Sequence, residues 1–335
     1  MRKAPEPQDG GSIAPWKPPT DFCIAPPWPK EPPGPPPITK PVSHSGRIRH
    51  TNTMCDNRHT GSASPTKLAA LGEEGGATRG VSEEMLLVKN AADKQQGELT
   101  ILLKAGHNPN VLVKVPWQDF ETTPLFEASV NGYKRIVRVL IEHGSKVDTV
   151  VGPGFSAVYN AALNGHFDSV RLLVDAGATV ATVTDSGFSP LFVACQGGHT
   201  DCVVSILGSP TMTKAAADIA PSKLNGATAL YIAAQNGHAD CVEQLLHAGV
   251  NVDPQMADGS TPLHIAMFLA ERDADRPHVE ITAMLLENGA SLDLKNQQGH
   301  SVRELAKDDY SLVEMVKSEE ELRERQKKTG QRGWW

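Results

Sequence analysis

The chain has 335 residues, 39% of them apolar, and a formal charge of −7. The first 80 residues carry a net +3 and residues 317–335 a net +2, which leaves −12 for residues 81–316. An acidic body of this kind argues against nucleic-acid binding. No apolar run reaches the roughly 18 residues of a membrane span, and the first residues lack the apolar segment of a secretory signal.

The first 80 residues are rich in proline and have no regular apolar spacing. Fourteen of the 25 prolines precede Val42. Such a segment cannot bury enough apolar surface to offset the entropy of ordering, so we expect residues 1–80 to be a disordered tail with polyproline II character. Lys30, Pro33 and Pro36 fit the basic-x-x-Pro-x-x-Pro pattern that polyproline-binding domains recognise. The alternative is that the tail is only a spacer.

A second short motif lies in the same tail. Ser64 is followed by Pro65, and a basic residue, Lys67, comes two positions later. This order is typical of a proline-directed phosphorylation site. Because phosphate adds charge there without a folding penalty, we predict that Ser64 is phosphorylated.

From residue 81 onward one pattern recurs along the chain. A Ser or Thr that can cap a helix is followed by Pro or Ala at the first helical position, at spacings of 33, 33, 39 and 33 residues. The pairs are Thr123-Pro124, Ser156-Ala157, Ser189-Pro190, Thr228-Ala229 and Thr261-Pro262. Each unit has two short helices, and a glycine ends each of them. The glycines that end the first helices are Gly132, Gly165, Gly198 and Gly237. Those that end the second helices are Gly144, Gly177, Gly249 and Gly289. Neither helix is long enough to be stable alone, so the units must stack.

The units fill a repeat domain that we place at residues 81–317. A degenerate first unit, Val81–Asn110, precedes five full units, and Asn296–Val316 forms a C-terminal cap. The full units are Gln118–Asp148, Val151–Val183, Thr184–Ser222, Lys223–Asp253 and Met256–Asp293. Residues 318–335 form a charged extension, expected as a frayed helix with Glu321–Arg325 and Glu324–Lys328 pairs.

The segment Thr261–Ala266 reads Thr-Pro-Leu-His-Ile-Ala. Together with the period of 33 residues, this segment resembles the ankyrin repeat, and the resemblance covers roughly residues 81–316. It implies an all-α solenoid of stacked helix-turn-helix repeats with β-hairpin tips and a concave binding face. An aromatic residue replaces the motif histidine in four units, at Phe126, Tyr159, Phe192 and Tyr231. We expect this exchange to weaken the polar bracing between the cap and the neighbouring loop.

No pattern typical of catalysis, of a cofactor or of a metal site occurs in the chain. His166, His199, His238 and His264 occupy repeat positions, where we expect structural hydrogen bonds. Cys195 lies in a first helix without basic neighbours that would lower its pKa. Cys202 and Cys241 occupy equivalent positions, and we interpret both as packing residues in a reducing compartment, the cytoplasm or alternatively the nucleus.

The resemblance indicates which repeat positions face a partner. The position before the cap holds phenylalanine in two successive units, at Phe155 and Phe188, where we expect exposed rings that anchor an interface. The alternative is that these two rings pack on each other. Positions near the end of the first helix are expected to line the same groove. They hold Val130, Leu163, Gln196, Gln235 and Phe268, and Asn236 follows Gln235.

We therefore expect a monomeric, non-enzymatic adaptor that binds one protein in its concave groove and a second through the tail. Two alternatives remain open. The chain could be a stoichiometric inhibitor or assembly chaperone that masks a partner, with passive tails, or a scaffold tethered to cytoskeletal or membrane complexes. Deletion of residues 1–80 separates an adaptor from a masking protein, because only the adaptor needs its tail.

Overall fold

The computed structural model describes residues 82–213, 217, 226–272, 277–306 and 310–329. The chain divides into two units, Met1–Gly80 and Val81–Trp335. All the described residues belong to the second unit. The predictions made for the tail, which concern Lys30, Pro33, Pro36 and Ser64, lie outside the described residues.

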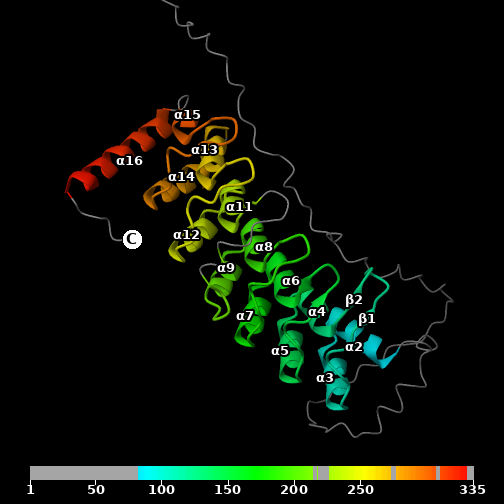
Figure 1. Cartoon of the computed structure of the whole chain (residues 1–335). Helices are drawn as coiled ribbons and strands as arrows, with labels where there is room; N and C mark the ends of the chain where they lie inside the picture. The colour runs from blue at the N-terminus through cyan, green and yellow to red at the C-terminus, as the bar shows by residue number, and fades with distance from the viewer. Residues whose placement is uncertain (1–81, 214–216, 218–225, 273–276, 307–309, 330–335) are drawn as a thin grey trace, which may run out of the picture. The chain divides into compact units, whose positions relative to one another are not determined.

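The repeat unit is built from two layers of short helices, and this arrangement confirms the expected solenoid (Figure 1). The first layer contains α2 (Glu83–Ala92), α4 (Pro124–Val130), α6 (Ala157–Leu163), α8 (Pro190–Gln196), α11 (Ala229–Gln235) and α13 (Pro262–Arg272). The second contains α3 (Gln96–Lys104), α5 (Lys134–Glu142), α7 (Phe167–Asp175), α9 (Thr200–Leu207), α12 (Ala239–His247) and α14 (Pro277–Glu287). Each helix packs on the next helix of its own layer and on its partner within the repeat. The apolar core therefore runs between the layers.

The first helices begin where the capping pattern places them. The hydroxyl oxygens of Thr123, Ser156, Ser189 and Thr228 each accept a hydrogen bond from the backbone N–H three residues later, over 3.1–3.3 Å. These bonds satisfy backbone donors that a helix leaves unpaired at its N-terminus. Pro124 and Pro190 occupy the first helical position, where a missing N–H is tolerated.

Short hairpins precede the first helices. β1 (Val113–Lys114) pairs with β2 (Glu121–Thr122), and β3 (Val150–Val151) pairs with β4 (Phe155–Ser156). In the later repeats one backbone hydrogen bond spans the equivalent turn, from Thr184 to Phe188 and from Met256 to Ser260. The hairpins therefore occur at the same place in successive repeats.

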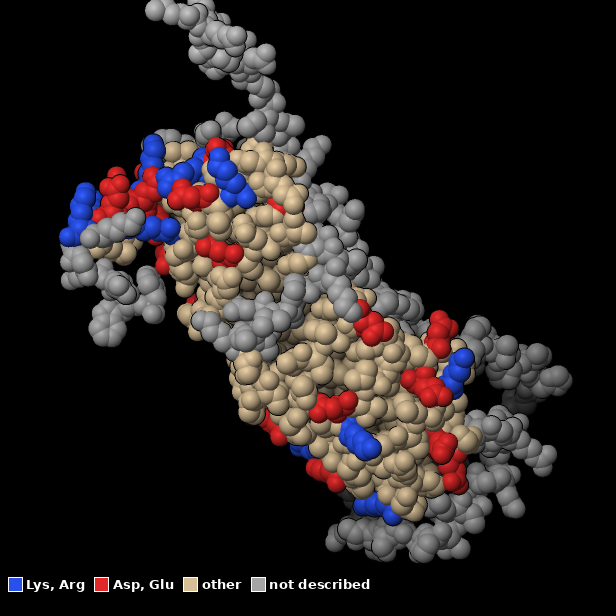
Figure 2. All heavy atoms as spheres, in the orientation of Figure 1, with Lys and Arg blue, Asp and Glu red and all other residues tan. Residues whose placement is uncertain are grey.

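The C-terminal segment forms a long helix that packs on the last repeat. After α15 (Val302–Leu305), the 20-residue helix α16 (Tyr310–Thr329) packs on α14 and crosses the boundary that we placed after residue 317. The two expected i,i+4 ion pairs are present. The expected helix is present, and it makes contacts that the sequence did not predict: the Arg323 guanidinium donates to the Leu286 and Ala290 carbonyls and pairs with Glu319. Figure 2 shows a dense cluster of basic and acidic side chains on α16, whereas the middle repeats are mostly uncharged on the face drawn.

Candidate interaction surface

A ladder of glycine and histidine residues joins successive repeats. The His166 imidazole Nε2 donates to the Val130 carbonyl over 2.9 Å, and its ring lies against Gly132, where an added Cβ would approach the ring to 2.5 Å. Only glycine leaves room for this ring, and the positive φ of Gly132 also favours glycine. Each rung therefore fixes the end of one first helix to the start of the next second helix.

The same rung recurs three more times. Nε2 of His238 bonds to the Gln196 carbonyl over 3.2 Å and Nε2 of His278 to the Gln235 carbonyl over 3.3 Å, while His199 bonds to the Leu163 carbonyl. The structural role expected for His166, His199 and His238 is confirmed. Sequence reasoning missed His278, because the insertion between α13 and α14 separates it from Gly237.

The first junction of the stack is built differently. Lys94 takes the place of the glycine, with a positive φ of 62°, and Tyr133 takes the place of the histidine. The Lys94 ammonium lies 5.7 Å from the centre of the Tyr133 ring, within the range of a cation–π contact. A different residue pair therefore makes the equivalent contact at the N-terminal end.

The four residues whose carbonyls accept these bonds form a set that we call the helix-end row, namely Val130, Leu163, Gln196 and Gln235. Each is the last residue of its first helix and has a partly exposed side chain. Asn236 follows the row, is exposed, and donates from Nδ2 to the Gln196 carbonyl over 2.9 Å. The row changes from apolar at Val130 and Leu163 to polar at Gln196 and Gln235. Because the ladder fixes the backbone at each residue, the row presents side chains in set positions.

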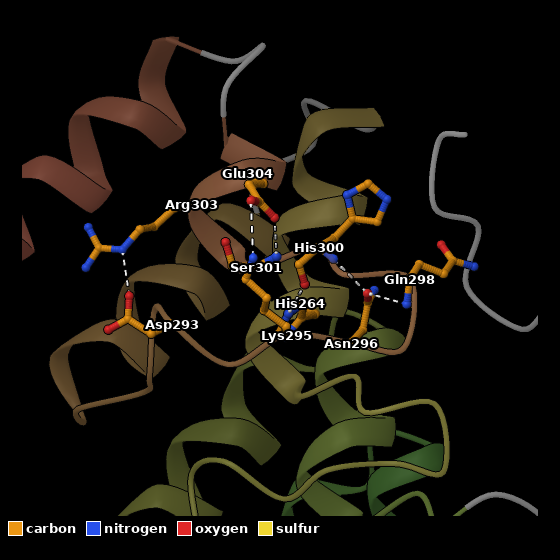
Figure 3. Close-up of polar contacts among 9 residues, drawn as sticks. All are labelled: His264, Asp293, Lys295, Asn296, Gln298, His300, Ser301, Arg303 and Glu304. Atoms are coloured by element: carbon orange, nitrogen blue, oxygen red, sulfur yellow. Dashed lines mark hydrogen bonds and ion pairs between the residues drawn. The ribbon is translucent and has the colours of Figure 1, made fainter. Parts of the chain in front are cut away.

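The motif histidine of the fifth full repeat makes the polar bracing that is typical of this repeat. Figure 3 shows His264 reaching the loop of the next repeat, where its Nε2 bonds to the His300 carbonyl over 3.2 Å. Its Nδ1 lies 2.7 Å from the Thr261 hydroxyl. The loop is ordered in turn by Asn296 Oδ1, which accepts from the His300 N–H, and by Glu304, which accepts from the Ser301 N–H.

The expected exposure of Phe155 and Phe188 is wrong, because these side chains are only 8% and 9% exposed. The Phe155 ring stacks on Tyr159, with centroids 5.5 Å apart and an interplanar angle of 20°, and the Phe188 ring lies 5.2 Å from Phe192. Each ring thus packs on the aromatic residue that replaces the motif histidine in its own repeat. The alternative, that the two phenylalanines pack on each other, is not the arrangement found: Phe155 instead contacts Phe120 of the preceding hairpin.

Burial lowers the pKa of His166 and His199 below the usual range, while their bonds to backbone carbonyls act in the opposite direction. In the unfolded chain a histidine titrates near pH ~6.5, so just below this pH the unfolded state binds more protons than the folded state. We expect the free energy of unfolding to have its full value above about pH 7 and to decrease as the pH drops through about 6.5. Denaturant titrations from pH 7.5 to 5.5 measure this slope.

The control for this prediction is a pair of variants. His166→Gln with His199→Gln should flatten the slope, whereas His247→Gln on the exposed face of α12 should leave it unchanged. The buried carboxyl of Glu127 has a pKa that burial raises, which favours the folded state at low pH, so only the difference between variants isolates the histidines. Equal slopes in all three proteins would contradict the prediction.

The described residues also bear on chemistry other than binding. They contain no group of three His, Cys, Asp or Glu side chains that could hold a metal ion. Cys195, Cys202 and Cys241 are free and buried between helices. Within the same described segments, no helix is both long enough and apolar enough to cross a membrane.

Comparisons with known proteins agree with this geometry. The family model for ankyrin repeats matches three times, over residues 88–184, 150–218 and 191–296. Among solved structures, the ankyrin repeat domain of human ASB11 is 28% identical, with a TM-score of 0.54 over 70% of this chain and 96% of that one. The ankyrin repeat protein EF0377 is 26% identical, with a TM-score of 0.52 over 58% and 96%.

A third structure is similar in fold alone. The ankyrin repeat domain of Bcl-3, described as a unique member of the IkappaB protein family, has a TM-score of 0.57 at 21% identity, over 69% of this chain and 97% of that one. No curated protein matches the chain.

Proposed function

The chain belongs to the ankyrin repeat family, whose repeats are generally protein–protein interaction modules, and on that premise we propose that it is a non-enzymatic adaptor. A partner protein binds the face that carries the helix-end row. The observation that supports this proposal most is the ladder, which holds four side chains of graded polarity in fixed positions. A surface ordered before binding loses little entropy on association. Val130 and Leu163 supply the apolar centre, and Gln196, Gln235 and Asn236 supply a polar rim.

The proline-rich tail is the second docking segment in this proposal, through Lys30, Pro33 and Pro36, and Ser64 is its regulatory phosphorylation site. The adaptor acts as a monomer in a reducing compartment, the cytoplasm or the nucleus, since its buried thiols are free. Removal of residues 1–80 should abolish the link between two partners but leave binding at the row intact. A masking protein would keep its full effect after this deletion.

The partner face is tested by the double variant Val130→Ser and Leu163→Ser in the full chain. Both side chains are already partly exposed, so the melting temperature should change little, whereas capture of the partner from a lysate of expressing cells should be lost. Val204→Ser is the matched control, because Val204 is 48% exposed on the second-layer helix α9. Unchanged capture by the double variant would rule out this face.

A further inference from the structure

A second surface recurs on the hairpins. Six residues before the cap lie Trp117, Val150 and Val183 in three successive repeats, and these side chains are 41%, 52% and 48% exposed. We call this set the hairpin stripe. Val150 and Val183 lie opposite the capping residues of their hairpins, at the same place in two successive repeats. Trp117 lies in the longer loop between β1 and β2, where Val113 pairs with Thr122. The three side chains are large, apolar and exposed on neighbouring hairpins, which is more than scattered exposed residues provide.

The fold does not require apolar residues at this position. In later repeats the equivalent residues are Gln255 and Lys295, both exposed. Lys295 pairs with Ser301 across its turn just as Val150 pairs with Ser156, so the register is the same. The hairpin therefore tolerates polar side chains here, and the apolar residues Val150 and Val183 need another explanation.

Trp117 is held in place from beneath. Its indole N–H donates to the carboxylate of Glu127, a side chain that is only 3% exposed. The same carboxylate accepts from Gln118 Nε2 over 2.7 Å and from the Thr122 hydroxyl over 2.8 Å. Because the single polar atom of the indole faces inward, the part of the ring in solvent is apolar and fixed in orientation.

The hairpin that carries Val150 is also well packed. In the hairpin β3–β4, Val150 points outward while its neighbour Val151 is 3% exposed and pairs with the buried Phe155. A ligand on the stripe therefore meets a surface that is ordered before binding, which limits the entropy lost on association.

The charges near the stripe are mostly acidic. The exposed acidic side chains of these hairpins and their flanking turns outnumber the basic ones by four to two. They are Asp119, Glu121, Asp148 and Asp185, against Lys114 and Lys146. The whole of residues 81–316 has the same bias, with 28 Asp and Glu against 16 Lys and Arg. Complementarity therefore favours a basic ligand.

The spacing of the stripe indicates the conformation of that ligand. A polyproline II segment has three residues per turn and rises about 3.1 Å per residue, so every third side chain falls on one face about 9 Å apart. That distance is close to the roughly 8–10 Å between stacked helices, so two apolar side chains three positions apart can meet Val150 and Val183. The residues between them project toward the acidic rim.

We propose that the hairpin stripe binds a basic segment of a partner protein in polyproline II conformation, with an apolar side chain at every third position. This inference rests on the proposed function, and it adds a second contact surface and the chemistry of its ligand.

The probe is a fluorescent peptide that repeats Leu-Lys-Pro five times, with a matched peptide that repeats Leu-Glu-Pro. Fluorescence anisotropy with the full chain should show binding of the lysine peptide, stronger at low salt, and no binding of the glutamate peptide. The variant Val150→Ser with Val183→Ser should weaken binding at least about tenfold, which corresponds to about 1.4 kcal/mol. Adding Trp117→Ser should abolish it. The control variant is Ile101→Ser with Val204→Ser, which removes side chains that are 49% and 48% exposed on second-layer helices.

The inference is overturned if the lysine peptide does not bind, if the glutamate peptide binds equally well, or if the control variant loses as much affinity as the stripe variant. Thermal melts of each variant exclude unfolding as the cause, and the two-valine variant serves if Trp117→Ser disturbs its hairpin. If the stripe variants bind the probe normally while Val130→Ser with Leu163→Ser still loses the captured partner, the proposed function stands and this inference fails.

Discussion

Phe155→Ala and Phe188→Ala should each lower the free energy of unfolding by about 3–5 kcal/mol, as truncation of a buried phenylalanine does. The reason is the burial of both rings against Tyr159 and Phe192, with Phe155 also in contact with Phe120 of the neighbouring hairpin. Removal of either ring leaves a cavity where a hairpin meets its first helix. Urea unfolding followed by circular dichroism measures the change.

The control variants for this experiment change the residue five positions before each phenylalanine. Val150→Ala and Val183→Ala alter exposed side chains of the same hairpins, so they should change the free energy of unfolding by no more than about 0.5 kcal/mol. If the phenylalanine variants are as stable as the valine variants, the rings are not part of the core and the packing described for the hairpins is wrong.

Gly165→Ala should destabilise the repeats by about 2–5 kcal/mol through two effects. Gly165 has a φ of +69°, and a Cβ on it would lie 2.5 Å from the His199 ring. A left-handed backbone costs a non-glycine residue about 1–2 kcal/mol. Forcing the ring away from its carbonyl should cost about 1–3 kcal/mol more, as overpacking does.

A second glycine separates these effects. Gly177 has a φ of +85°, but no atom would lie within 4 Å of its added Cβ, so Gly177→Ala measures backbone strain alone. The excess for Gly165→Ala should shrink in the double variant with His199→Ala, because the clashing ring is then absent. Equal losses for Gly165→Ala and Gly177→Ala would show that the ladder is not tightly packed.

The repeats and their caps could be predicted from the sequence because both depend on local chemistry. A capping hydroxyl and a glycine with positive φ act within one repeat, so their spacing is visible along the chain. The helix-end row followed from the same period, and its four side chains are partly exposed. Phe268, expected at the same position of the fifth full repeat, is instead only 5% exposed. The hydrogen bonds from the histidines to the carbonyls of the row could not be predicted from this period. The bond from His278 was the hardest to predict, because inserted residues precede this histidine and change its spacing.

The error at Phe155 has a different physical origin. Strands of two residues are too short to show the alternation that separates the buried from the exposed face. The rings that bury Phe155 come from the following helix and from the preceding repeat, so the packing is not visible in one repeat alone. The position six residues before the cap could have been recognised as outward-facing, because it holds Gln255 in a later repeat.

Hydroxyl-radical footprinting of the full chain, alone and with the captured partner, tests most directly whether the repeat face is the binding surface. Mass spectrometry reports the labelling of each side chain. We expect the partner to reduce labelling at Val130 and Leu163, while Ile101 and Val204 on the second-layer helices keep theirs. Protection of Ile101 and Val204 with unchanged labelling of Val130 and Leu163 would contradict the account, because the partner would then bind the opposite layer.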